Sequence, residues 1–496
     1  MTLATATTTG AAGPPASDAA FHVERHGIDF IPESERWARP RDVGGMWAGA
    51  SVQIEYFIYG AILMTFGFTF AQAVAVIVVG NISYLLLGLC SLQGPQTGTT
   101  VFAINRASFG PNGSRGLALF NWITMIGFEV EGLILIVGAA LVLCVKAGFS
   151  PGDPAKALLV IAAVAVQAVL PFLGHATILK VLRVLVLPFV VLFGALAAFA
   201  APHVTTDAVT GGASWQTWTE GLAFTITLSG LGWAECGNDY TRYCSPDASR
   251  RSIVGWVFAG TAVPQILIMT LGAAVGTFLT SVGTASNAFL PFARQSAIPG
   301  WFVTVFLVFS IAQLFAVNSL DLYSSGVTLQ AMGVRVKRYQ AVVVDCCLAL
   351  VVTLYAVFNS SFKGYLTDFV DLVIVWIAPW AAIYLVDWAM RRYRYAPGEL
   401  QRTDRGGLYY RTGGICWEAV AAQVLGMYAA MSALSTTFRV PMWLDPITWA
   451  TRNAGGSGAD FSVFLGMGVA GLAYLAAGWR SVRAQATRQE ELAAGT

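Results

Sequence analysis

The chain is dominated by apolar runs that are long enough to cross a lipid bilayer. A helix needs about 20 apolar residues to span roughly 30 Å of hydrocarbon, and twelve such runs can be counted in the 496 residues. Only 11% of the residues are charged and 56% are hydrophobic, which excludes a soluble protein with an ordinary charged surface. The sequence therefore predicts an all-α polytopic membrane protein with twelve transmembrane helices, at about 43–68, 71–93, 116–145, 156–174, 181–201, 217–243, 253–280, 300–330, 340–359, 366–390, 413–434 and 461–480.

The basic residues predict the orientation of these helices. Lysine and arginine concentrate in cytoplasmic loops, and with the N-terminus inside the cell, 23 of the 29 basic residues fall on the cytoplasmic side. We therefore expect a multi-pass protein of the cell (inner) membrane with both termini in the cytoplasm. The predicted segments are a cytoplasmic tail at 1–42, a ten-helix transport core at 43–393, a cytoplasmic loop at 394–412, two additional helices at 413–483 and a cytoplasmic tail at 484–496.

Ionisable residues inside the predicted spans are the first candidates for function. A charged side chain at the bilayer centre costs at least about 2.5–3.5 kcal/mol, so acids at that depth are expected to face a cavity. The deep acids are Glu55, Glu129, Glu131, Glu235 and Asp321. Because Glu129 and Glu131 point about 200° apart on a helix, they cannot serve one ligand equally. Acids nearer the span ends are more simply explained as solvated or paired, and these are Asp239, Asp345, Asp371 and Asp387.

The first and sixth spans combine glycines with polar groups where a transmembrane helix should be most apolar. Three glycines precede Gln53 and Glu55 in the first span, and Gly232 precedes Trp233 in the sixth. This composition predicts unwound helices whose free backbone groups bind substrate or ions, although glycine also serves close helix packing in membranes. Because the two spans are five apart, they predict two inverted repeats, each beginning with a broken helix.

Aromatic and amide side chains near these breaks suggest the ligand. The ring of Trp233 can stack on a planar molecule, and Phe128, which shares a face of the third span with Glu131, can form the other side of a sandwich. Gln53, Asn318 or Asp321 can then read the edge of the ligand. The arrangement suits a flat heterocycle with ring N–H and carbonyl groups.

Neither catalysis nor ATP use is indicated. The four histidines lie in tails or at span ends, the seven cysteines lack metal-type spacing, and no nucleotide-binding glycine motif precedes a lysine. The net charge of +2 gives no case for nucleic acid. We expect no enzyme activity, no metal and no cofactor. An ion gradient is then the remaining energy source.

Five stretches of the chain resemble the nucleobase-cation symporter family, in particular its purine-cytosine permease branch. They are Gly94–Gly98, Arg106–Gly110, Asn121–Gly127, Gly232–Trp233 with Asp239–Arg242, and Leu322–Ser325. The resemblance implies a LeuT-type 5+5 inverted-repeat fold with broken helices 1 and 6, two additional helices, and a substrate held between spans 1, 3, 6 and 8. It also implies that Trp233 stacks on the base and that Asn318 contacts it. Phe128 stands where relatives usually have Trp, and Asp321 where many have Asn.

The resemblance leaves the coupling ion open. Sodium-coupled relatives place Ser or Thr hydroxyls five and six residues before the eighth-span asparagine, where this chain has Gln313 and Ala312. A sodium site would thus be incomplete. Deep carboxylates can instead take up and release a proton, because removal from water favours their neutral form. We therefore favour H+ over Na+, with Glu131, Glu129, Glu55 and Asp321 as candidate carriers.

The leading hypothesis is a secondary active symporter that imports a nucleobase, cytosine or a purine, or a similar planar heterocycle by alternating access. Its partners are then a small heterocyclic substrate and the lipid bilayer, and the sequence predicts no oligomeric state. One alternative is a transporter of the same fold for allantoin, hydantoin, thiamine or another vitamin, or one coupled to sodium. A channel or a membrane receptor is less favoured: saturable, concentrative uptake would argue against a channel, and the tails are too short for the signalling domain that a receptor needs.

Overall fold

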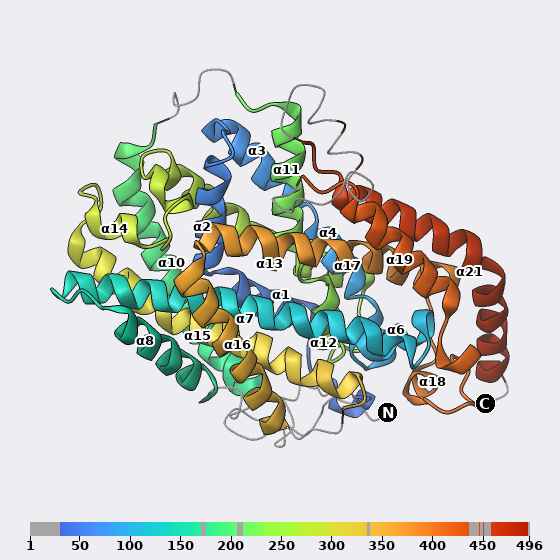
Figure 1. Cartoon of the computed structure of the whole chain (residues 1–496). Helices are drawn as coiled ribbons and strands as arrows, with labels where there is room; N and C mark the ends of the chain where they lie inside the picture. The colour runs from blue at the N-terminus through green and yellow to red at the C-terminus, as the bar shows by residue number, and fades with distance from the viewer. Residues whose placement is uncertain are drawn as a thin grey trace, which may run out of the picture.

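The computed structural model describes residues 30–169, 175–205, 212–334, 338–435 and 458–494, together with Pro446 and Ala450. Most of these residues form a bundle of helices (Figure 1). An isolated bridge between Ala38 and Cys244 is the one β-type pairing in the described ranges. Residues 1–29, which make up most of the predicted N-terminal tail, lie outside the described residues.

Nine helical segments of the described chain are long and apolar enough to cross a membrane. One is the interrupted segment Phe70–Thr97. The others correspond to α7 (Gly113–Lys146), α10 (His175–Ala200), α13 (Arg250–Gly276), α15 (Gly300–Ala331), α16 (Arg338–Asn359), α17 (Phe362–Met390), α19 (Trp417–Met431) and α21 (Ser462–Ala494). All nine coincide with predicted spans. Their outward faces carry exposed apolar side chains such as Leu187 and Leu267, as expected for surfaces that contact lipid.

Within the described residues, the other three predicted spans are short or interrupted, which is why length alone does not identify them; residues 170–174, at the end of the fourth, lie outside the described residues. The first consists of α1 (Pro40–Ser51) and α2 (Ile54–Met64), and the fourth contains α8 (Asp153–Gln167). The sixth is divided into α11 (Trp215–Ile226), η4 (Thr227–Leu231), η5 (Ala234–Cys236) and α12 (Gly237–Thr241). The breaks predicted in spans 1 and 6 are therefore present, and the architecture is consistent with twelve spans.

The second span was predicted as one continuous helix, but the structure divides it. It consists of α3 (Phe70–Asn81), α4 (Tyr84–Cys90) and α5 (Gln93–Thr97). The first interruption lies against the broken sixth span, where the Gly230 N–H donates to Ser83 Oγ at 3.0 Å. A Cβ atom on Gly230 would lie 2.1 Å from the Ser83 carbonyl carbon, so glycine permits this backbone contact. The interruption of span 2 thus fits the break of span 6.

The last two long helices flank the bundle. α19 and α21 lie together beside α17 at one side of the molecule (Figure 1). The short helices α6 (Val101–Phe109) and α18 (Pro397–Gln401) lie in loop regions, and α18 falls within the predicted loop 394–412. α21 continues as a helix to Ala494, through most of the predicted tail at 484–496.

Candidate functional site

The break between α1 and α2 consists of Val52 and Gln53. Gln53 has extended backbone angles, with φ −140° and ψ 157°, and neither end of the break has a local side-chain cap. The side chain of Gln313, from α15, bridges it instead: its Nε2 donates to the Val52 carbonyl, and its Oε1 accepts from the Ile54 N–H at 3.3 Å. A distant helix therefore satisfies the backbone groups that the break leaves free.

The break in the sixth span is held in a similar way from α13. Ser229 leaves helical geometry, with φ −118° and ψ −121°. The Gln265 side chain donates to the Leu228 carbonyl at 3.3 Å and to Ser229 Oγ at 2.8 Å. Both breaks are thus irregular backbone inside the protein, where side chains satisfy polar groups that lipid could not.

A small cavity lies between the two breaks. Six of the residues singled out from the sequence line it, namely Gln53, Glu55, Phe128, Gly232, Trp233 and Asp321. The remaining lining residues are Tyr56, Tyr59, Thr227, Leu228 and Val317. Four elements that lie far apart in sequence, α2, α7, α15 and the sixth-span break, therefore contribute to one enclosed site.

Trp233 is held by contacts on the side of the first span. Its indole N–H donates to the Tyr56 hydroxyl at 3.0 Å, and the edge of Trp47 packs against its ring with centroids 5.5 Å apart. The hydrogen bonds continue from Tyr56 to Tyr84 at 3.4 Å, and from the Tyr84 hydroxyl to Gln265. Because Gln265 also holds the sixth-span break, this network fixes the ring in relation to both breaks.

Phe128 approaches the opposite part of the sixth-span break. Its ring stands perpendicular to that of Phe369 from α17, with centroids 4.8 Å apart. A Cβ atom on Gly232 would lie 2.4 Å from the Thr227 carbonyl oxygen and 3.8 Å from the Phe128 ring. A larger residue at 232 would therefore displace the break. Glycine at this position lets the backbone, rather than a side chain, line the cavity.

Of the five deep acids, two line the central cavity and three do not. Glu55 and Asp321 line the cavity, whereas Glu131 lies behind it and accepts a hydrogen bond from the Tyr59 hydroxyl at 2.5 Å. Asp321 lies within electrostatic range of the other four, Glu55, Glu129, Glu131 and Glu235. The side-chain oxygens of Glu235 are buried without a hydrogen-bond partner in the described chain.

Asn318 and Glu129 lie on the other side of the α7 and α15 contact. The Asn318 amide donates to the Glu129 carbonyl at 2.9 Å and to the Gln167 side chain at 3.1 Å. The Gln167 amide in turn donates to the Glu129 carboxylate at 2.5 Å. These residues join α7, α8 and α15 and are not among those that line the cavity. A role for Asn318 in contacting a base, and for Glu129 in proton coupling, stays a prediction.

Residues 30–451 match the sequence model of a family described as permeases for cytosine/purines, uracil, thiamine and allantoin. The chain belongs to this family. A putative purine-cytosine permease of Bacillus subtilis is 25% identical over 95% of this chain and 99% of the relative. A purine-cytosine permease of Emericella nidulans is 23% identical over 92% and 88% of the two chains. A vitamin B6 transporter of Saccharomyces cerevisiae is 25% identical over 72% of this chain and 64% of its own.

Solved structures show the fold of this permease. The inward-facing conformation of Mhp1 superimposes with a TM-score of 0.73 at 19% identity, over 96% of this chain and 97% of that one. Mhp1 is described as a nucleobase-cation-symport-1 family transporter, and its closed form with bromovinylhydantoin bound gives a TM-score of 0.68 over 94% and 99%. The predicted family and the predicted inverted-repeat fold are both confirmed. The family consists of permeases. Membership in it supports a role in membrane transport rather than in catalysis.

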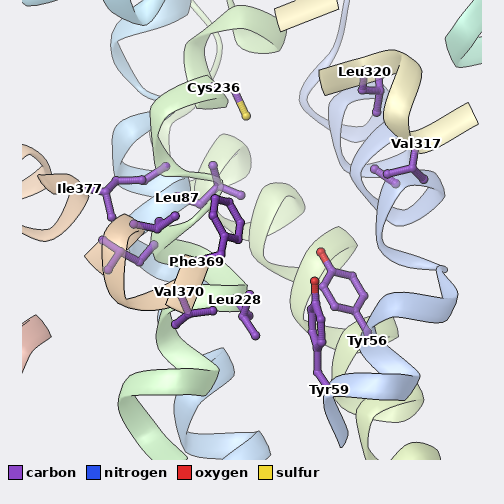
Figure 2. Packing of buried hydrophobic residues seen from close by; sticks show 14 of the residues in the cluster. Tyr56, Tyr59, Leu87, Leu228, Cys236, Val317, Leu320, Phe369, Val370 and Ile377 are labelled. Carbon is purple, nitrogen blue, oxygen red and sulfur yellow. The ribbon is translucent and has the colours of Figure 1, made fainter. Parts of the chain in front are cut away.

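Several residues that line the permease cavity were not predicted. Tyr59 follows Glu55 by four positions, which places it on the same face of α2 one turn later, and Tyr56 lies in the first turn of that helix, three positions after Gln53. Figure 2 shows the two rings side by side, with both hydroxyl groups pointing the same way. Their helical spacing from the polar residues was the signal available in the sequence. Thr227, Leu228 and Val317 carry no comparable signal, because their types are common in any apolar span.

The two ends of the permease differ in how they are closed. A larger cavity lies near the end of α2 and is lined by Phe66, Phe224 and Asp371, among others. The edge of Phe224 contacts Tyr59, which lines the central cavity, so these rings lie between the two spaces. At the opposite end of the span, Arg36 donates to the Pro95 carbonyl at 2.6 Å and Ala38 to the Tyr243 carbonyl at 2.9 Å.

The stretches that carried the family resemblance lie largely at this second end. The Gly94 N–H donates to Asn238 Oδ1 at 2.6 Å, and the Val101 N–H donates to Asp239 at 3.2 Å. They therefore attach α5 and α6 to α12, directly after the sixth-span break. Among the described residues, no group of three or more His, Cys, Asp or Glu side chains is arranged to hold a metal ion.

Proposed function

We propose that this permease is a secondary active symporter that imports a nucleobase, cytosine or a purine, or a similar planar heterocycle, by alternating access. The observation that carries the proposal is the central cavity, in which Trp233 and Phe128 lie with Gln53 and Asp321 between two broken helices. Gln53 Oε1 is buried without a hydrogen-bond partner in the described chain, which leaves it free to accept from a ring N–H. Aromatic faces supply stacking, and the polar groups orient the ring edge.

The closed contacts at one end and the wide cavity at the other support alternating access. In such transporters one repeat rocks against the other around a central site. Tyr59 and Phe224 would then separate the substrate from the outer cavity, and the contacts of Arg36 and Ala38 would open towards the cytoplasm. This assignment agrees with the distribution of basic residues, which predicts that both termini lie on the cytoplasmic side of the cell membrane.

A proton is the proposed coupling ion, with Glu131, Glu129, Glu55 and Asp321 as candidate carriers. Glu131 is the strongest of the four, because its partner Tyr59 lies on the half-helix that follows the first break and also lines the cavity. Proton uptake by Glu131 would change a hydrogen bond to a wall of the site. Substrate binding and protonation would thereby be linked through one contact.

A second candidate is a vitamin or a hydantoin-like heterocycle as the substrate. It is favoured by two similar proteins, one described as a vitamin B6 transporter and the other solved with bromovinylhydantoin bound. Phe128 stacks over a smaller area than an indole would, which alters the ring sizes that fit opposite Trp233.

Transport by purified protein in liposomes tests the proposal. Labelled cytosine, adenine, hypoxanthine, allantoin, thiamine and pyridoxine are offered in turn, with an inward proton gradient, with the gradient collapsed by a protonophore, and with sodium replaced by choline. We expect saturable accumulation of one base class that the protonophore abolishes and choline leaves unchanged. Downhill flux without saturation would indicate a channel, and accumulation driven by sodium alone would contradict proton coupling.

A further inference from the structure

Gln313 lies on the same stripe of α15 as two residues of the cavity wall. Positions 313, 317 and 321 are separated by four residues, so their side chains lie above one another on one helix face. Val317 and Asp321 line the cavity, and Gln313 lies one turn beyond them, with 2% of its surface exposed. It therefore occupies the place where this face of α15 meets the α1–α2 break.

An unwound helix in a transporter leaves backbone carbonyls that characteristically coordinate a cation. At this break the Val52 carbonyl oxygen already accepts a hydrogen bond from Gln313 Nε2, and the Ile54 N–H donates to Gln313 Oε1 at 3.3 Å. The amide thus supplies an N–H donor to the oxygen that an ion would bind, and it also satisfies the donor across the break. The side chain fits between α1 and α2 as a neutral bridge.

The neighbouring groups on α15 do not supply the oxygens that a sodium ion would need. Ala312 has no side-chain oxygen, and the Ser310 hydroxyl donates to the Phe306 carbonyl of its own helix at 2.8 Å. These residues do not fit a cation at the break. The Gln313 amide is the group of α15 that bonds to both sides of it.

We propose that Gln313 takes the place of a coupling cation at the first break, holding α1, α2 and α15 together so that this permease needs no sodium. The inference deepens the proposed transport function, since it concerns the ion and not the base. It assigns Gln313 as a positioning residue that acts through the Val52 and Ile54 backbone. The substrate cavity begins one residue further along, at Gln53.

The first test is the thermal unfolding of purified wild-type protein without substrate, in sodium, potassium or choline chloride at one ionic strength. We expect the same Tm in all three salts. A saturable rise in Tm that is specific to sodium would overturn the inference. Because no substrate is added, this result is independent of whether a nucleobase is transported.

The second test is Gln313→Glu, which keeps the size and shape of the side chain but replaces the donor with an oxygen. When the new carboxyl group is ionised, it faces the Val52 carbonyl, and a small cation can bind between the two oxygens. We expect sodium or lithium to raise the Tm of this variant above its value in choline, increasingly so from pH 6 to pH 9. Uptake in choline should fall at least about tenfold, because a buried bridging hydrogen bond is lost, and sodium should restore part of it.

Gln423→Glu is the matched control. The Gln423 amide also donates to a backbone carbonyl, that of Trp376 at 2.9 Å, but it lies on α19 away from both breaks. This variant should show no sodium-specific change in Tm. If Gln313→Glu responds to sodium no more than Gln423→Glu at any pH, the inference is wrong. If Gln313→Glu does not fold, the salt series on the wild-type protein decides the question.

Discussion

The hydroxyl group of Tyr59 on α2 donates a 2.5 Å hydrogen bond to the carboxylate of Glu131 on α7. One partner belongs to the half-helix that follows the first break, and the other to a helix of 34 residues that crosses the bundle. A hydrogen bond to an ionised acceptor is roughly twice as strong as one between neutral groups. The strength of this contact between α2 and α7 therefore depends on whether Glu131 carries a proton.

Glu131→Gln should separate transport from the proton gradient. The amide has nearly the same shape and can still accept from Tyr59, but it cannot release a proton. We expect exchange of labelled substrate across the liposome membrane to continue, while accumulation against a gradient and its sensitivity to a protonophore are lost. Glu129→Gln is the comparison. If the Glu131 variant still accumulates substrate in a protonophore-sensitive way, another acid must carry the coupling proton.

Trp233→Ala should weaken substrate binding. Stacking of a base on an aromatic ring contributes about 1–3 kcal/mol, so we expect Kd to rise by roughly 5- to 150-fold, and Trp233→Phe to lie between. The measurement is binding of the transported compound by calorimetry. Trp301→Ala is the control, because that side chain is 67% exposed at the start of α15. Unchanged affinity in the Trp233 variant would rule out the stacking role.

Gly232→Ala should impair transport more than an equivalent substitution elsewhere. The added Cβ atom would lie 2.4 Å from the Thr227 carbonyl, so the sixth-span break must move. We expect uptake to fall at least about tenfold, equivalent to about 1.4 kcal/mol. Gly255→Ala serves as the control, since a Cβ there meets no atom within 4 Å. Equal uptake by the two variants would show that the close contact at 232 is unimportant.

Substitutions of Asp321 and of Asn318 should have different effects. Asp321→Asn alters the cavity wall, so we expect a changed order of inhibition among competing heterocycles with a similar Tm. Asn318→Ala removes hydrogen bonds between α15, α7 and Gln167, and we expect it to destabilise the protein by about 1–3 kcal/mol. Competition assays and thermal unfolding distinguish the two. A changed inhibition order without loss of stability in the Asn318 variant would instead place that residue in substrate recognition.

The helices were predictable because each depends on a local property, the length of an apolar run. The breaks were predictable for the same reason, since glycine and polar residues such as Gln53 occur where lipid tolerates neither. The interruption between α3 and α4 at Ser83 was not predicted. It depends on contact with the backbone of Gly230, which lies far away in the sequence. Gly80, Asn81 and Ser83 do lie within the apolar run, but the prediction of one continuous span does not treat them as a sign of a break.

The rotation of α15 about its axis decides which of two polar residues, Asn318 or Asp321, faces the cavity, a question that the sequence left open. Asn318 and Asp321 are both polar, lie at similar depth and are three residues apart, so helical spacing alone places them near one face. The structure turns Asp321 into the cavity and Asn318 towards α7 and α8. Packing against those two helices sets that rotation, and a single sequence contains no record of it.

The bridge made by Gln313 also bears on the energetics of a transport cycle. An ion that binds on one side of the membrane and dissociates on the other brings the free energy of its gradient into the cycle. A side chain returns to its starting state after every turnover, so it stabilises a conformation without contributing to the final concentration ratio. In this permease the first break would then affect how fast the steady state is reached, while the accumulation limit would be set by the carboxylates.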